Sequence, residues 1–267
     1  MRYDRTPHAP REPRAHLAPK MIQFRHLKKS FGPKTVLNDV SFDVNDGEVF
    51  FIIGASGAGK SVCIKHLVGL LKPDEGEVIL DGEDIAQLTE EQFYRIRKKV
   101  AMVFQHSTLF DSMTCAENVA LPLRKHKGLS VKDSLAEAMK RLEVVHMREF
   151  AEKYPAELGD GMRKRVAFAR ALTLEPRYVL FDEPTTSLDP VSARRVDRLI
   201  RELSDKLGVT SIVVSHDLVS IFSIADRIAM VYQTKLKKVG TREEFKNTDD
   251  PVVRQFITGT AEGPMQV

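Results

Sequence analysis

The stretch GASGAGKS, residues 54–61, decides the fold of this chain. It follows the apolar run EVFFII (48–53) and leads into the helix-like run VCIKHLVGLL (62–71). The pattern GxxxxGK[ST] between a strand and a helix predicts a loop whose amide groups wrap a phosphate, with a lysine on the outer phosphates and a hydroxyl on Mg²⁺. A glycine-rich turn without a ligand is the alternative, and the flanks favour the phosphate site. The phosphate-binding residues that we expect are Gly54, Ala55, Ser56, Gly57, Ala58, Gly59, Lys60, Ser61 and Val62.

The bulk composition describes a chain that can bury a core. It has 267 residues, 42% hydrophobic and 29% charged, which suits one α/β domain with an insertion or two small domains. The net charge of +4 is a small surplus, which a nucleotide or a membrane face explains as well as nucleic acid does. The two cysteines, Cys63 and Cys115, form no metal or CxxC pattern, so we expect a reducing, cytoplasmic compartment.

The apolar runs are of strand length, far below the ~18 residues that a membrane-spanning helix needs. Residues 1–20 contain scattered prolines and basic residues without an apolar centre, so they predict a disordered tail and no signal peptide. From residue 21 onward, continuous apolar runs alternate with amphipathic stretches, which is typical of a buried parallel sheet covered on both faces. Residues 114–171 show helical spacing only, so we expect a helical insertion.

Several helix ends have their own signals. Asp189 and Pro190 predict a helix start, and Gly208 predicts its end. Three pairs resemble capping boxes that open further helices. These pairs are Thr89 with Gln92, Ser130 with Asp133, and Thr241 with Glu244.

A second motif, YVLFDEP (178–184), ends an apolar strand with Asp182 and Glu183 side by side. Parallel-sheet folds bind their ligands at this edge of the sheet. Adjacent strand residues point in opposite directions unless the strand is ending. Asp182 can therefore coordinate Mg²⁺ while Glu183, in the turn, faces an attacking water. A solvent-facing acidic pair is the alternative.

Further motifs follow in a set order: VFQHSTLFDSMT (103–114), ELGDGMRKRV (157–166), SLDP (187–190) and VVSHD (213–217). Together with the two motifs above, they make residues 21–245 resemble the nucleotide-binding subunits of ABC transporters. The resemblance implies an α/β P-loop NTPase of ABC type, with an N-terminal antiparallel β portion, a parallel-sheet core and an inserted helical subdomain. We expect the ATPase domain over 21–246, the subdomain over about 106–173, and an extension over 247–267.

The resemblance also assigns roles. Two cassettes meet head to tail as a homodimer, and each ATP lies between the P-loop of one copy and the signature loop of the other. Glu183 then polarises the attacking water, His216 contacts the γ-phosphate, and Gln105 senses Mg²⁺ and water. Sequence neighbours cannot stack into a relay, so Ser215, His216 and Asp217 are no hydrolase triad. A buried structural histidine is the alternative for His216.

The remaining expected site residues also come from the resemblance. Phe31 stands where the family has an aromatic residue, usually Tyr, that stacks on adenine. Gly159, Asp160 and Gly161 of the signature loop contact the partner's ATP, and Asp189 helps to join the two sites. The expected metal ligands are Ser61, Gln105 and Asp182, and the expected cofactors are ATP and Mg²⁺.

The signature loop departs from the family pattern LSGGQ, because this chain has LGDGM (158–162). At Gly159 the hydroxyl that donates to the γ-phosphate is missing, and at Asp160 a carboxylate appears beside it. Both changes weaken the contact, although the basic run 163–165 can pull Asp160 aside. We therefore predict a slow ATPase whose closure depends on its membrane partner. A non-hydrolysing regulatory cassette is the alternative.

Short segments resemble the lipid-trafficking cassettes of the Mla or MCE type, above all the tail DDPVVRQFITGTAEGP (249–264). In those proteins the tail often associates with the neighbouring protomer, and a frayed terminus is the alternative. The resemblance implies a permease that docks around residues 105–123, an MCE-domain protein, in some systems a STAS-domain protein, no nucleic acid, and a place on the cytoplasmic face of the inner membrane. An importer of small solutes is the other candidate. Soluble ABC ATPases of DNA repair or translation carry two cassettes or a long coiled coil, which this chain lacks.

Overall fold

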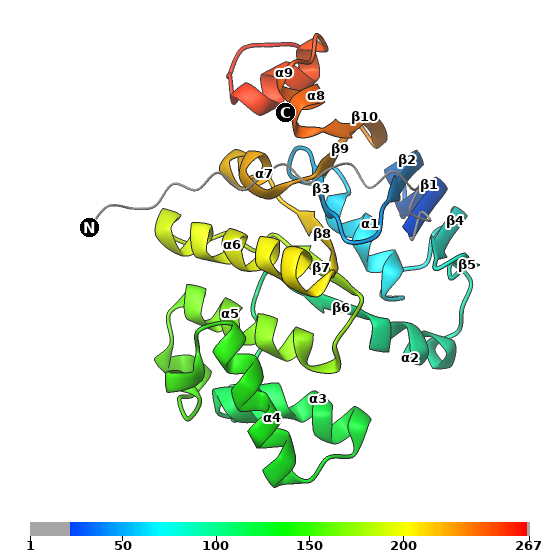
Figure 1. The fold of residues 1–267 in the computed structure, drawn as a ribbon. Coiled ribbons are helices and arrows are strands. Elements are labelled where there is room, and N and C mark those ends of the chain that lie inside the picture. The colour runs from blue at the N-terminus through cyan, green and yellow to red at the C-terminus, as the bar shows by residue number, and fades with distance from the viewer. Residues whose placement is uncertain (1–21, 266–267) are drawn as a thin grey trace.

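The computed structural model describes residues 22–265 (Figure 1). The predicted disordered tail over residues 1–20 and the last two residues of the predicted extension lie outside this range. Two sheets pack against each other, and a group of helices covers the free face of the larger sheet. Among the described residues, no helix combines the length and the apolar character that crossing a membrane requires.

The smaller sheet is antiparallel and has the strand order β2-β1-β4-β5. Its strands are β1 (Ile22–Phe31), β2 (Lys34–Val44), β4 (Glu75–Leu80) and β5 (Glu83–Asp84). Phe24 of β1 pairs with Phe42 of β2 on one side and with Val78 of β4 on the other. The expected N-terminal antiparallel portion is therefore confirmed.

The larger sheet has the strand order β10-β9-β3-β8-β7-β6. Strands β6 (Val100–Val103), β7 (Tyr178–Asp182), β8 (Thr210–Val214), β3 (Val49–Ile53) and β9 (Arg227–Tyr232) run parallel, and β10 (Lys235–Thr241) pairs with β9 antiparallel at one edge. Every residue of β3, β7 and β8 is buried. The expected parallel core is confirmed.

The alternation along β3 explains why the strand is apolar throughout. Val49, Phe51 and Ile53 belong to the core under the helices, whereas Phe50 and Ile52 belong to the core shared with the smaller sheet. Successive strand side chains point to opposite faces, so a sheet covered on both sides needs apolar residues at every position.

Between β6 and β7, the chain forms helices and turns. These are α3 (Cys115–Lys127), α4 (Val131–Val144), η1 (Arg148–Phe150), η2 (Pro155–Glu157), α5 (Asp160–Ala171) and η3 (Leu172–Leu174). They lie at the opposite end of the molecule from the C-terminal helices (Figure 1). A helical insertion is thus present, and its first helix begins at Cys115.

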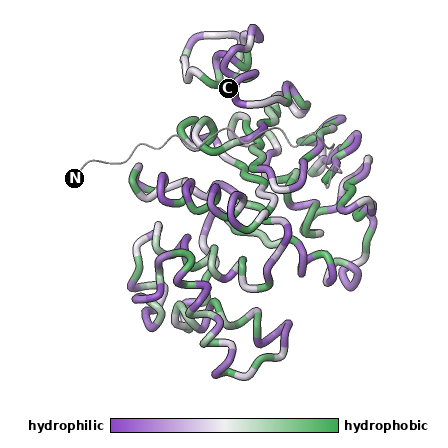
Figure 2. Tube along the Cα trace, viewed as in Figure 1, coloured by the Kyte–Doolittle hydropathy of each residue, from purple (hydrophilic) through white to green (hydrophobic). Residues whose placement is uncertain are grey.

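The other helices are α1 (Lys60–Leu67), α2 (Glu90–Lys99), α6 (Pro190–Leu207), α7 (Leu218–Ile224), α8 (Arg242–Lys246) and α9 (Pro251–Thr258). Hydrophilic and hydrophobic residues alternate along α6, as its amphipathic packing requires (Figure 2). Asp189 caps α6 and Gly208 ends it, as the sequence predicts.

The capping boxes at Thr89 and Thr241 are confirmed. The prediction for Ser130 is half right. Its hydroxyl accepts a hydrogen bond from the Asp133 amide, but it also donates to the Asp133 carboxylate at 2.6 Å. The shorter aspartate side chain is thereby held by the hydroxyl, and no reciprocal bond to the Ser130 amide forms.

The structure describes the C-terminal tail as far as Met265, and this part of the tail contacts the rest of the chain. Helix α9 begins at the Asp250 cap, and the Met265 amide donates to Gln255 Oε1 at 2.7 Å. The Met265 side chain packs into the core of its own chain.

Candidate functional site

The loop 54–59 curls between the end of β3 and the start of α1. Gly54 has φ +144°, and a Cβ atom there would lie 2.2 Å from the carbonyl oxygen of Val231. Gly59 has φ +95°, and a Cβ atom there would contact Val36 and Leu37 at 2.8–3.0 Å. Only glycine satisfies both demands, so the loop conformation follows directly from the sequence.

Lys60 occupies the inside of this loop. Its Nζ donates to the carbonyl oxygens of Gly54 and Ala55, both at 3.0 Å. Burial lowers the pKa of Lys60, and the carboxylates of Glu183 and Asp182 oppose that shift. The ammonium group lies 4.0 Å from Glu183 Oε1, so a positive charge sits at the carboxyl edge of the sheet.

Ser61 and Asp182, which are 121 residues apart in sequence, meet through a hydrogen bond from Ser61 Oγ to Asp182 Oδ1 at 2.5 Å. Asp182 ends β7 and is only 7% exposed. Residues 22–265 contain no cluster of three or more His, Cys, Asp or Glu side chains that could hold a metal ion. One hydroxyl and one carboxylate still fit Mg²⁺, which keeps several waters and takes further ligands from substrate phosphates.

Glu183 diverges from Asp182, as expected for a strand end. Its backbone has φ +51°, and its Oε2 lies 2.9 Å from His216 Nδ1. Thr186 Oγ1 donates to the same oxygen at 3.0 Å. The Glu183 side chain is 13% exposed and lies between Lys60 and His216, so the alternative of a solvent-facing acidic pair is wrong.

His216 is not a buried structural histidine, because 62% of its side chain is exposed. It contacts Glu183, and its neighbour Asp217 instead caps α7 by accepting from the amides of Val219 and Ser220. The exclusion of a serine-hydrolase triad is therefore confirmed.

Two expected site residues are exposed and share no hydrogen bond or ion pair with this group within residues 22–265. Gln105 follows β6 and is exposed, and within residues 22–265 it is not among the hydrogen-bond partners of Lys60, Asp182 or Glu183. Phe31 ends β1 and is 46% exposed, with Lys29 Nζ 5.6 Å from its ring centroid.

Lys164 is a site neighbour that the sequence reasoning missed. It belongs to the basic run 163–165, yet it is 4% exposed and donates to the carbonyl oxygens of Thr186 at 2.8 Å and Glu183 at 3.3 Å. Burial lowers its pKa. The available signal was its position four residues before the buried Phe168, on the apolar face of α5.

The signature loop forms the start of α5, with Gly159 as the N-cap. Asp160 is 57% exposed and is drawn into an ion pair with Arg163, as the sequence suggested. Arg163 also donates to the carbonyl oxygen of Leu158 at 2.9 Å. A Cβ atom on Gly161 would lie 3.2 Å from Ser192, so the loop faces the start of α6.

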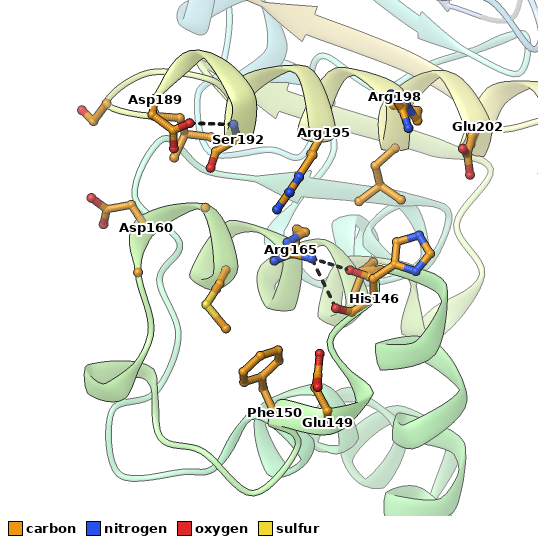
Figure 3. Close-up of a pocket in the computed structure, with 17 residues that line it drawn as sticks. His146, Glu149, Phe150, Asp160, Arg165, Asp189, Ser192, Arg195, Arg198 and Glu202 are labelled. Carbon is orange, nitrogen blue, oxygen red and sulfur yellow. Dashed lines mark hydrogen bonds between the residues drawn. The ribbon is translucent and has the colours of Figure 1, made fainter. Parts of the chain in front are cut away.

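A pocket of about 850 Å³ lies beside this loop, between α5, α6 and the turn after α4 (Figure 3). Arg165 and Arg195 point toward each other across it, and Arg165 donates to the His146 carbonyl oxygen at 3.2 Å. Glu149 and Glu202 also line it. None of its lining residues belongs to the loop 54–61, so within one chain the phosphate loop does not reach the pocket beside the signature loop.

Comparison with known proteins places this geometry in a family. The family described as "ABC transporter" matches residues 37–186. The intermembrane phospholipid transport system ATP-binding protein MlaF of Escherichia coli K12 is 37% identical over 245 residues, which are 92% of this chain and 91% of that protein.

Two further comparisons extend this result. The probable ribonucleotide transport ATP-binding protein mkl of Mycobacterium leprae is 37% identical over 91% of this chain and 70% of its own length. The dimeric post-hydrolysis structure of the ATP-binding cassette MJ0796 bound to ADP and Pi superposes with a TM-score of 0.76 at 31% identity, covering 83% of this chain and 99% of that one. A shared fold, a family match over more than half of the chain and near full-length identity of 37% lead to one conclusion: this protein belongs to the ABC transporter family, as one of its ATP-hydrolysing cassettes.

Proposed function

We propose that two copies of this chain bind two MgATP molecules head to tail and hydrolyse them to drive phospholipid trafficking at the cytoplasmic face of the inner membrane. A separate permease and an MCE-type protein complete the system, and a STAS-type subunit is a candidate accessory. In this organisation, residues 21–246 form the ATPase domain, residues 106–173 its helical subdomain and residues 247–267 an extension.

The observation that carries the catalytic part is the position of Glu183, with Lys60 Nζ at 4.0 Å and His216 Nδ1 at 2.9 Å. In the proposed mechanism, Lys60 leaves its two loop carbonyls to contact the β- and γ-phosphates. Glu183 orients the attacking water and accepts its hydrogen bond, while His216 contacts a γ-phosphate oxygen. Phosphoryl transfer is catalysed largely by such positioning and charge stabilisation.

We propose Ser61 and Asp182 as the protein ligands of Mg²⁺, since their oxygens already meet at 2.5 Å. The metal would supply charge neutralisation on the phosphates. Gln105 would contribute from its exposed loop, and Phe31 would stack on the adenine ring at the exposed end of β1.

Head-to-tail pairing is supported by the place of the signature loop. Gly159 and Gly161 lie beside Asp189 and Ser192, away from the phosphate loop of the same chain. Their amide groups at the start of α5 suit a phosphate, so the ATP that they contact belongs to a second copy. The MJ0796 structure named above is a dimer bound to ADP and Pi.

The permease would dock on the loop between Gln105 and α3. Asn118, buried in α3, fixes this loop: its Nδ2 donates to the carbonyl oxygens of Phe110, Met113 and Thr114 at 3.0–3.1 Å, and its Oδ1 accepts from the Phe110 amide. The Phe110 side chain is nevertheless 50% exposed. A rigid loop that presents an exposed aromatic side chain suits a helix of a membrane partner.

The phospholipid cargo is supported by the near full-length similarity to MlaF. A small-solute importer remains the second candidate, because the relative mkl carries the name of a ribonucleotide transport protein. Purification of the tagged full chain from membranes in mild detergent separates the two. Recovery of a permease with an MCE protein supports lipid transport, and recovery of a permease with a solute-binding protein contradicts it.

The catalytic part is tested by the ATPase rate of Glu183→Gln beside that of Glu243→Gln. Glu243 is an exposed carboxylate of α8 that pairs with Lys246 at 2.9 Å and, within residues 22–265, is not among the polar partners of Lys60, Glu183 or His216. We expect Glu183→Gln to lose ATP turnover by about 10²-fold or more while still binding nucleotide, and Glu243→Gln to keep the wild-type rate. Equal rates in the two variants would contradict the assignment.

A further inference from the structure

Arg194 connects two segments that flank the candidate catalytic group. It lies in the second turn of α6, five residues after Asp189. Its Nη1 lies 2.7 Å from Asp197 Oδ2 on the same helix, and its Nη2 lies 2.5 Å from Asp217 Oδ2 at the start of α7. Nη2 also donates to Ser220 Oγ at 3.1 Å. One guanidinium group therefore links α6 to the turn that carries His216.

Asp217 has both carboxylate oxygens engaged. Its Oδ1 caps α7 through the amides of Val219 and Ser220 at 3.0 and 3.3 Å, and its Oδ2 takes the ion pair with Arg194. Its own amide donates to Ser215 Oγ at 3.0 Å. The residues on both sides of His216 are thereby held, so the backbone of this turn follows the position of Arg194.

Asp197 makes this link costly to break. It is 3% exposed, and burial raises its pKa to about 6. Ser220 Oγ lies 3.0 Å from Asp197 Oδ2 and 2.9 Å from Asp217 Oδ2, so its one proton serves both carboxylates. Two carboxylates share one guanidinium and one hydroxyl, so removal of the guanidinium leaves the carboxylates without a counter-charge and pushes them apart.

His216 needs such support because its side chain is largely exposed. Its side chain is 62% exposed, and its Nδ1 lies 2.9 Å from Glu183 Oε2. A ring that is largely exposed takes much of its placement from the backbone that carries it.

We propose that Arg194 is a positioning residue for ATP hydrolysis, which holds Asp217 against α6 and so couples the start of α6 to the placement of His216. This inference rests on the proposed function of His216 and Glu183. Because Asp189 caps the same helix, a displacement of that end by a second copy reaches the His216 turn through Arg194. The coupling element is a partly buried ion-pair network within one chain, in which Asp197 is the buried member.

The test compares Arg194→Ala with Arg201→Ala in the full chain. Arg201 lies on the same helix and pairs with Asp205 and Asp226, both at 2.8 Å, so its loss also removes two ion pairs. We expect Arg194→Ala to lower kcat about 10–100-fold, with KM for ATP changed less than about threefold. Arg201→Ala should lower the thermal midpoint to a similar extent and keep kcat within about twofold of the wild type.

A double-mutant cycle with His216→Ala identifies the route. If Arg194 acts through His216, adding Arg194→Ala to His216→Ala lowers kcat by less than about twofold further. Arg194→Lys should restore part of the rate, because an ammonium group reaches one carboxylate but cannot bridge two. Should Arg194→Ala fail to fold, Arg194→Lys takes its place in the cycle.

Three results would overturn the inference: an unchanged kcat in Arg194→Ala, full multiplication of the two losses in the cycle, or an equal loss of kcat in Arg201→Ala. A wild-type chain without any MgATP hydrolysis, alone or with its membrane subunits, would instead overturn the proposed function. The two failures are therefore distinguishable.

Discussion

Gly159→Ser adds to the signature loop the hydroxyl that most ABC cassettes have there. The backbone at Gly159 has φ −71° and ψ 162°, and a Cβ atom would meet no other atom within 4 Å. A serine therefore fits without strain, at an N-cap position where its oxygen suits the helix start. We predict that Gly159→Ser raises ATP turnover, because in the proposed head-to-tail dimer the added hydroxyl would donate to the γ-phosphate bound to the partner copy.

The expected size follows from the contacts at this helix end. A hydrogen bond to a charged acceptor contributes about 1.5–3 kcal/mol. The equilibrium constant for closure of the dimer can therefore rise by roughly 10–100-fold at most. The same hydroxyl can also cap α5, and this competition reduces its contribution to the phosphate contact. We therefore expect about a 3–10-fold gain in kcat, and a free energy of unfolding within a few tenths of a kcal/mol of the wild-type value.

Adding Asp160→Gly moves stability and activity in opposite directions. Asp160 is 57% exposed and pairs with Arg163, a contact that contributes about 0.2–1 kcal/mol at such exposure. Its negative charge at the start of α5 adds roughly 0.3–1 kcal/mol. The double variant should therefore be about 1 kcal/mol less stable and yet faster, since in the proposed dimer no carboxylate would remain beside the phosphate.

The assay is steady-state phosphate release at saturating MgATP, with chemical denaturation on the same samples. Gly159→Ala is the matched control, because it fills the same space without a donor and should not gain activity. A rate in Gly159→Ser that equals or falls below the wild-type rate would show that this loop is adapted to its glycine and aspartate, and would refute the impaired-contact reasoning.

Three further variants test the physical reading of single residues. Burial lowers the pKa of His66 from 6.5 to about 4, so this histidine contributes stability that is complete above about pH 6.5 and is lost as the pH falls through 4. His66→Leu should therefore flatten the pH dependence of the free energy of unfolding across that window. An unchanged slope of that free energy against pH, measured by urea denaturation, would disprove this. Burial raises the pKa of Asp197 from 3.8 to about 6, so its effect on stability has the opposite pH dependence: its contribution is complete below pH 3.8 and is lost as the pH rises through 6. Asp197→Asn should remove that loss. Gly54→Ala, whose Cβ would lie 2.2 Å from the Val231 oxygen, should lower the thermal midpoint by several degrees and abolish nucleotide binding; full binding would mean that the loop relaxes freely.

The sequence predicted the features that depend on local chemistry. The glycines of the loop 54–61, the apolar runs of the parallel strands and the caps at Thr89, Asp189 and Thr241 each need only neighbouring residues to act. Motif order then placed Asp182 and Glu183 at the site, and the structure brings Asp182 to Ser61 and Glu183 to His216.

Features that depend on distant segments could not be predicted in this way. In the sequence, Lys164 belongs to a basic run that is typical of a surface. Its burial follows only from the packing of α5 against the turn after β7. The Arg194 contact with Asp217 spans 23 residues and requires α6 and α7 to be in place. Likewise, the insertion expected from residue 106 begins with a turn, and its first helix begins only at Cys115. The buried Asn118 stabilises this turn by donating to the carbonyl oxygens of Phe110, Met113 and Thr114.

The central claim is that ATP is bound by the phosphate loop of one copy and enclosed by a second copy. The most direct measurement uses Glu183→Gln, purified with its membrane subunits, in light scattering coupled to size-exclusion chromatography with and without MgATP. We expect one retained nucleotide per chain and a dimer of this chain that forms only with MgATP. A chain that neither retains MgATP nor pairs in its presence would contradict the central claim.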